Sequence, residues 1–179
     1  MILERWTTPK MIGGSLGLVI LFLLLFQGIL IPRFSQLTGG GTILDMQILY
    51  SPQEAYASID NYGEAGRAFY TYIQITDMLF PLAYVWSLAI LIHAVGRRAF
   101  PAISLWRYCP LLPVLAGVSD YIENVGIFLM LRRYPDPFPG IAWATSLCGA
   151  LKFSLLGLSV ACIILGVGRI SINAATETL

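Results

Sequence analysis

Residues 11–31 form an almost uninterrupted apolar run. At a rise of about 1.5 Å per residue, a helix of this length crosses a hydrocarbon core of roughly 30 Å. Arg5 and Lys10 precede the run, as in a signal peptide, but the apolar stretch is too long and no small-x-small cleavage site follows it. We therefore expect a membrane span that stays in the mature protein.

Three further segments have a similar character, at about 70–95, 111–131 and 141–167. Hydrophobic residues make up 57% and charged residues 12% of the chain, against roughly 45–50% and about 25% in an average soluble domain. Lipid is therefore the expected main solvent. The sequence predicts one membrane domain, residues 1–179, with an all-α fold of four transmembrane helices in an up-down bundle.

Prolines mark the boundary between the third and fourth spans. Pro110 and Pro113 fall in the first turn of the third span, where a missing N–H is tolerated. The segment 135–140 contains three prolines and a glycine and predicts a tight turn. We expect the third and fourth spans to be adjacent and antiparallel.

Basic residues outside the spans indicate the orientation, with six on the side of the termini and four on the other. The first group is Arg5, Lys10, Arg97, Arg98, Arg107 and Arg169, and the second is Arg33, Arg67, Arg132 and Arg133. The positive-inside bias then favours two cytoplasmic termini. We expect a multi-pass integral protein of a bacterial inner membrane, with the acidic residues Asp45, Glu54, Asp60 and Glu64 outside.

The connection 33–69 is too long for a simple loop and predicts structure of its own. Ser51, Pro52 and Glu54 fit the N-cap, N1 and N3 positions of a short helix that ends near Gly63. Apolar and aromatic residues recur along it every three to four positions, as in a helix that lies on the mouth of the bundle. They are Ala55, Tyr56, Ile59 and Tyr62.

Five tyrosines near this connection predict an aromatic belt at the outer membrane surface. They are Tyr50, Tyr56, Tyr62, Tyr70 and Tyr72. The alternative is a lid that gates a ligand.

Several short motifs from the connection through the third span resemble a pattern in uncharacterised bacterial four-span membrane proteins. They are Tyr50-Ser-Pro-Gln-Glu-Ala, Gly63-Glu-Ala-Gly-Arg-Ala-Phe-Tyr70, Asp77, Pro81 and Asp120-Tyr-Ile-Glu-Asn124. The resemblance supports the four-span architecture and implies no activity.

Four ionisable residues fall inside the predicted spans, namely Asp77, Asp120, Glu123 and Lys152. Such groups are expensive in a membrane and usually face the bundle interior, so each is a candidate catalytic residue. Counted from the turn between the last two spans, Asp120 and Lys152 are each about 18 Å deep at the helical rise. We expect them to pair, with a proton, a cation or a cationic ligand balancing the remaining carboxyl group.

Polar neighbours extend this cluster and are candidate ligand-binding residues. Asn124 shares a helical face with Asp120 and Glu123, and Cys148 shares one with Lys152. Gln74 and Tyr84 follow the face of Asp77, where Pro81 removes the backbone donor for the Asp77 carbonyl and predicts a kink.

Three functions stay open, and so does the question of enzymatic activity. In the first, the chain binds or acts on a small amphipathic or lipid-like ligand; its architecture is similar to that of four-span sterol isomerases, although it lacks their motifs. In the second, it is a non-catalytic subunit or assembly factor of a larger membrane complex. In the third, it carries protons or ions. A buried pair that only fixes helix packing is the structural alternative. The step Gly13-x-x-x-Gly17 suits close approach by another helix, in a partner or a homo-oligomer.

Other classes are disfavoured. The net charge of +1 and the absence of a basic run argue against nucleic-acid binding. A single histidine, His93, does not provide the facing pair of a membrane b-type haem, and Cys109, Cys148 and Cys162 form no C-x-x-C motif. We expect neither a cofactor nor a metal.

Overall fold

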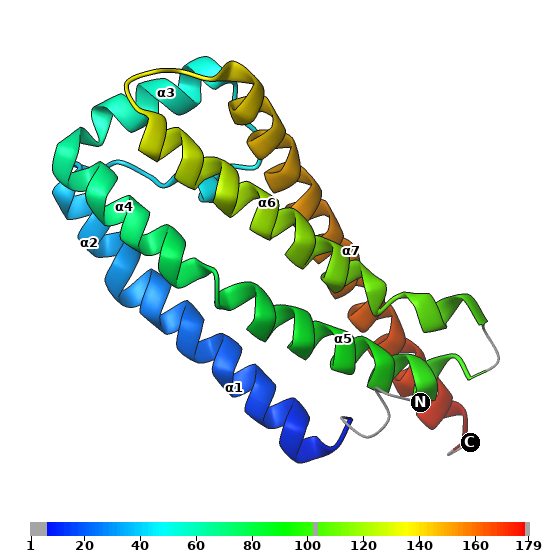
Figure 1. Cartoon of the computed structure of the whole chain (residues 1–179). Helices are drawn as coiled ribbons and strands as arrows, with labels where there is room; N and C mark the ends of the chain where they lie inside the picture. The colour runs from blue at the N-terminus through cyan, green and yellow to red at the C-terminus, as the bar shows by residue number, and fades with distance from the viewer. Residues whose placement is uncertain (1–6, 102–103, 178–179) are drawn as a thin grey trace.

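The computed structural model describes residues 7–101 and 104–177. Arg5, which the orientation count includes, lies outside the described residues. Four helical segments are long and apolar enough to cross a membrane: Pro9–Leu37, Gly63–Ala99, Leu105–Arg133 and Pro139–Thr176. They run side by side with alternating direction, and a short helix covers one end (Figure 1). The predicted all-α membrane bundle of four transmembrane helices is thus confirmed.

The helical elements follow the chain in a simple order. They are α1 (Pro9–Leu25), η2 (Phe26–Leu30), α2 (Ile31–Leu37), η3 (Leu44–Met46), α3 (Pro52–Asn61), α4 (Gly63–Asp77), α5 (Phe80–Ala99), η4 (Ser104–Tyr108), α6 (Leu111–Arg133) and α7 (Pro139–Glu177). We call the end of the bundle under α3 the α3 end, and the opposite end, where α7 finishes, the termini end (Figure 1).

The helices extend beyond the apolar runs that predicted them. The last span was expected to end near residue 167, but α7 continues to Glu177. A helix satisfies its own backbone groups in the headgroup layer as well as in hydrocarbon, so polarity alone does not end it. Hydropathy therefore predicts the buried part of each span and not its full length.

The helix of the first span widens into a π turn shortly before Pro32. In η2 the N–H of Ile31 bonds to the carbonyl of Phe26, five residues back, which is the spacing of a π turn. Pro32 follows directly and has no N–H to donate. The widened turn lets the helix pass the proline without ending.

The second span is broken between α4 and α5. Pro81 lies in the first turn of α5, and Met78 and Leu79 form the break. The Tyr121 hydroxyl of α6 donates to the Met78 carbonyl at 3.0 Å, so a neighbouring helix satisfies a backbone group at the break. The predicted kink is confirmed, although the supported carbonyl is one residue after that of Asp77.

Helices α6 and α7 share the most extensive contact in the bundle, as expected for antiparallel neighbours. Glycines allow their close approach, because a Cβ at Gly126 would collide with the Thr145 hydroxyl. Helix α1 is peripheral by contrast: it packs mainly on α5 and contributes no fully buried residue of its own.

The segment 38–51 folds into the α3 end of the bundle and does not lie on it. Leu44 is fully buried, and its N–H donates to the Tyr70 hydroxyl at 2.8 Å. Tyr50 donates its N–H to Ser146 Oγ on α7, also at 2.8 Å. This segment therefore plugs the space between α4, α6 and α7.

Helix α3 has the predicted capping box. The Glu54 N–H donates to Ser51 Oγ at 3.3 Å, and the Ser51 N–H donates to Glu54 Oε2 at 2.7 Å. Ala55 and Ile59 are fully buried against the bundle, which confirms the predicted inner face.

The predicted tyrosine belt is wrong for three of its members. Tyr50, Tyr62 and Tyr70 are buried, whereas Tyr72 is 54% exposed. Two of the buried hydroxyls find internal acceptors: Tyr62 donates to the Thr42 carbonyl at 2.6 Å, and Tyr70 donates to a carboxylate described below. A tyrosine with an internal partner is stable in a core, so its identity alone does not place it at an interface.

Candidate functional site

The ionisable residues of α6 and α7 meet in the bundle interior. Lys152 Nζ lies 3.3 Å from Asp120 Oδ1 and 2.5 Å from Glu123 Oε2. All three side chains are buried, and Glu123 is fully so. The predicted pair of Asp120 with Lys152 is confirmed, and the lysine also bridges to Glu123 at the shorter distance.

Neutral side chains hold the neighbouring carboxylates in place. Tyr84 of α5 donates its hydroxyl to Asp120 Oδ2 at 2.8 Å. Asn124 of α6 donates Nδ2 to Asp77 Oδ2 at 2.8 Å, which joins the end of α4 to α6. The residues that share a helical face in the sequence thus converge on one cluster.

A fourth carboxyl group reaches the cluster from η3. Asp45 accepts hydrogen bonds from the Tyr70 hydroxyl at 2.8 Å and from Gln74 Nε2 at 3.1 Å. Burial raises the pKa of the Asp45 carboxyl, and the Lys152 ammonium opposes this rise. The expectation that Asp45 lies on the outer side of the membrane stays a prediction, but its carboxyl group points into the bundle, where the sequence analysis did not place it. The side chain is half-buried, and the sequence signal for this was its place in the apolar stretch Ile43-Leu-Asp-Met46.

Asp45, Asp77, Asp120 and Lys152 line a cavity of about 370 Å³, and we call these four residues its floor. Tyr84 lies beside them, and the rest of the wall is largely apolar. Helix α1 with η2 contributes Leu23, Phe26 and Gln27, and α7 contributes Phe153 and Leu156. Side chains of all four spans and of η3 therefore bound the cavity, which combines this charged floor with an apolar wall.

The remaining predicted site residues stand behind this floor. Glu123, Gln74, Asn124 and Cys148 do not line the cavity. Glu123 sits beneath Lys152, in space that Gly149 leaves open, because a Cβ there would collide with the Glu123 carboxylate. Gln74 and Asn124 support Asp45 and Asp77, whereas Cys148 is a half-buried free thiol.

Three buried acceptor atoms of the cluster have no hydrogen-bond donor among the described residues. They are Glu123 Oε1, Gln74 Oε1 and Asn124 Oδ1. The two amide orientations follow from their contacts, because each nitrogen donates to a carboxylate that only accepts when ionised. The cluster thus has more acceptors than donors.

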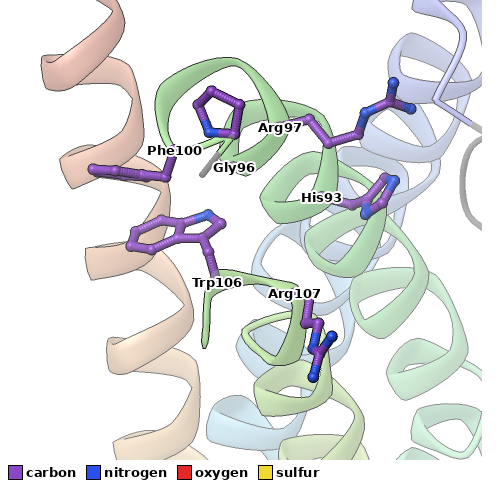
Figure 2. Close-up of a pocket in the computed structure, with 7 residues that line it drawn as sticks. His93, Gly96, Arg97, Phe100, Trp106 and Arg107 are labelled. Atoms are coloured by element: carbon purple, nitrogen blue, oxygen red, sulfur yellow. The ribbon is translucent and has the colours of Figure 1, made fainter. Parts of the chain in front are cut away.

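A second cavity, of about 310 Å³, lies at the termini end and differs in character. Figure 2 shows His93, Arg97 and Arg107 around it, with the Trp106 indole beside the Phe100 ring. The two ring centroids are 4.2 Å apart, and the indole packs on Gly96, where a Cβ would collide with it. His93 is therefore part of a basic, aromatic end of the bundle, well separated in sequence and depth from the acidic cluster.

No family model, curated protein or solved structure matches this chain. The resemblance to bacterial four-span proteins stays a prediction, and function is inferred from the geometry alone.

Proposed function

We propose that this chain binds a small amphipathic, lipid-like molecule in the cavity between α1 and α7. One observation carries the proposal: the cavity joins a floor of three carboxyl groups and an ammonium to a largely apolar wall. Its volume of about 370 Å³ is within the range of roughly 300–1,000 Å³ that is typical of small-molecule sites.

The position of the cavity favours entry from the bilayer. Leu23 forms part of the wall and is 43% exposed on the outer face of the bundle. The main packing partner of α1 is α5, so the seam toward α7 is closed by few direct helix contacts. An amphipathic molecule in the membrane would pass its head group through this seam and leave its tail along α1.

Both termini are proposed to be cytoplasmic, in a bacterial inner membrane. Lys10, Arg97, Arg98, Arg107 and Arg169 support this orientation, because they all belong to the termini end. The cavity then lies in the outer half of the bilayer, under the plug formed by residues 38–51. Labelling of Glu64→Cys in intact cells by a membrane-impermeant maleimide tests this orientation, and protection of that cysteine would reverse it.

A second candidate is a subunit of a larger membrane complex. Added Cβ atoms at Gly13 and Gly17 would meet nothing within 4 Å, so this close-approach step is unused inside the chain. A proton carrier has less support. Toward the termini end from Asp120, the buried polar side chains among the described residues are the serines Ser87, Ser119 and Ser159. Hydroxyls alone make a poor relay.

The test is native mass spectrometry of the protein in nanodiscs cut from its own membrane. We expect a small molecule at fixed stoichiometry on the wild type. Leu156→Trp fills the cavity and should lose that molecule, whereas the matched change Leu158→Trp, at a position 54% exposed, should retain it. Wild-type protein without a small molecule, or equal retention by both variants, would contradict the proposal.

A further inference from the structure

We infer that the head group accepted by the cavity is a protonated primary amine, held among Asp45, Asp77 and Asp120. This inference rests on the proposed function, which it deepens by naming the class of ligand. It follows from the charge, the hydrogen-bond inventory and the placement of the carboxylates.

The cluster has an excess of negative groups. Four carboxyl groups, those of Asp45, Asp77, Asp120 and Glu123, face the single ammonium of Lys152. That ammonium is shared by Asp120 and Glu123, so the side-chain hydrogen bonds that Asp45 and Asp77 accept among the described residues come from neutral donors. Since uncompensated charge is expensive in a medium of low dielectric, a cationic occupant would be stabilised there.

The hydrogen-bond inventory indicates a head group that donates. Four neutral side chains already donate hydrogen bonds to the carboxylates, namely the hydroxyls of Tyr70 and Tyr84 and the amides of Gln74 and Asn124. The unpaired atoms Glu123 Oε1, Gln74 Oε1 and Asn124 Oδ1 behind the floor are acceptors, and the unpaired Tyr50 hydroxyl is the one nearby atom that can also donate. An acceptor-only or anionic head group would add to this imbalance, and a head group with several N–H donors would relieve it.

The carboxylates arrive from different elements and surround one space. Asp45 comes from η3, Asp77 from the end of α4 and Asp120 from the middle of α6, and all three line the cavity. A primary ammonium has three N–H donors, one for each carboxylate. Within the described residues no group of three or more His, Cys, Asp or Glu side chains is placed to hold a metal ion, so the space suits a larger occupant.

Aromatic side chains form the wall next to this floor. The Phe80 ring lies 5.4 Å from the Tyr84 ring and 6.0 Å from the Phe26 ring, measured between centroids. All three rings line the cavity. They provide apolar surface for the first carbons of a tail and an aromatic environment that tolerates a cation.

The experiment compares three probes that share one photoreactive dodecyl tail and carry a primary amine, a trimethylammonium or a hydroxyl head. The protein is held in nanodiscs of phosphatidylcholine, and the concentration for half-maximal labelling of cavity residues is measured. We expect the primary amine to label at a concentration at least tenfold lower than the alcohol, with the quaternary amine in between.

Variants separate the head-group site from the tail site. Asp77→Asn and Asp45→Asn should each weaken labelling by the amine several-fold and leave the alcohol unchanged. The control Asp136→Asn removes the same charge at an exposed position and should change neither. Two cavity variants on different elements keep the test valid if one of them does not fold.

The outcomes distinguish the two levels of the proposal. Equal labelling of the cavity by the amine and the alcohol overturns the cationic head and leaves the amphipathic site in place. Equal labelling by the primary and quaternary amines overturns the requirement for N–H donors. Failure of all three probes to label the cavity, or labelling that Leu156→Trp does not reduce, overturns the proposed function itself.

Discussion

Glu123 depends on Lys152 for compensation of its charge more than Asp120 does. Glu123 is fully buried and forms its ion pair with Lys152, whereas Asp120 also accepts a hydrogen bond from Tyr84. Loss of the lysine therefore strands Glu123 first. A buried charge without its partner typically destabilises a protein by about 3–5 kcal/mol.

Lys152→Met should accordingly lower the free energy of unfolding by an amount on that scale, and a second change should restore part of it. We expect Lys152→Met with Glu123→Gln to recover more stability than Lys152→Met with Asp120→Asn. The measurement is thermal unfolding in mild detergent, followed by tryptophan fluorescence. Greater recovery with Asp120→Asn would mean that the closer contact is not the stronger one.

Gly149 makes room for the Glu123 carboxylate. A Cβ at this position would collide with Glu123 Oε1, so Gly149→Ala should destabilise the bundle by about 1–3 kcal/mol through overpacking. Gly157→Ala on the same helix is the matched control, because its Cβ would meet nothing within 4 Å. If the two alanine variants unfold at the same temperature, Glu123 does not occupy that space.

Asp45 should make stability depend on pH. Burial raises its pKa above 3.8, Asp120 adds to the rise, and Lys152 and Tyr70 oppose it. The folded protein then binds this proton at a higher pH than the unfolded chain does. The contribution of Asp45 to the free energy of unfolding therefore rises as the pH falls through this raised pKa. It reaches its full value below pH 3.8, the ordinary pKa of the group.

The comparison of Asp45→Asn with wild type isolates this contribution: the advantage of the wild type should grow as pH falls. Glu54 provides the opposite sign, because hydrogen bonds from Ser51 lower its pKa and its contribution is lost as pH falls. Unfolding of Asp45→Asn, Glu54→Gln and the wild type is followed across pH in detergent, and the stability differences from the wild type should have pH slopes of opposite sign. A pH-independent difference for Asp45→Asn would place that carboxyl in water.

At the scale of elements, α3 begins at a complete capping box. Ser51→Ala removes the acceptor for the Glu54 N–H and one donor to its carboxylate, and should cost about 1 kcal/mol. Gln53→Ala is the control, since Gln53 is exposed in the same turn. Hydrogen exchange of the α3 amides reports the change locally, and equal protection in both variants would contradict the role of the cap.

The cluster on α6 and α7 could be predicted because helical periodicity determines which side chains share a face. Asp120, Glu123 and Asn124 recur at three and four residues, and the depth expected for Asp120 matched that of Lys152. The capping box of α3 is similarly local, so its sequence pattern was sufficient.

Asp45 and the buried tyrosines could not be placed in the same way. Their environment depends on how segment 38–51 packs against α4, α6 and α7, which are distant in sequence. Tyr70 and Gln74 lie about two turns and about one turn of helix before the break at Met78, yet only the folded loop gives them Asp45 as a partner. The cavity wall was missed for the same reason, because residue spacing does not say which helices are neighbours.

At the scale of the whole molecule, the bundle has a tightly packed half and a loosely attached first span. Helices α5, α6 and α7 form the packed half, and α1 rests mainly on α5. The carboxylates thus lie at the edge of the packed half, where α1 and the plug over the α3 end enclose them. This arrangement places the carboxylates on the side of the bundle where α1 is loosely attached.

The proposed ligand cavity is tested most directly by photocrosslinking in living cells from a benzoylphenylalanine placed at residue 156, with residue 158 as the control. Position 156 lines the cavity, and position 158 is exposed on the outer surface of α7. We expect a distinct small adduct of constant mass at 156 and only bulk phospholipid adducts at 158. Identical lipid adducts at both positions, or a polypeptide crosslinked at 156, would contradict it.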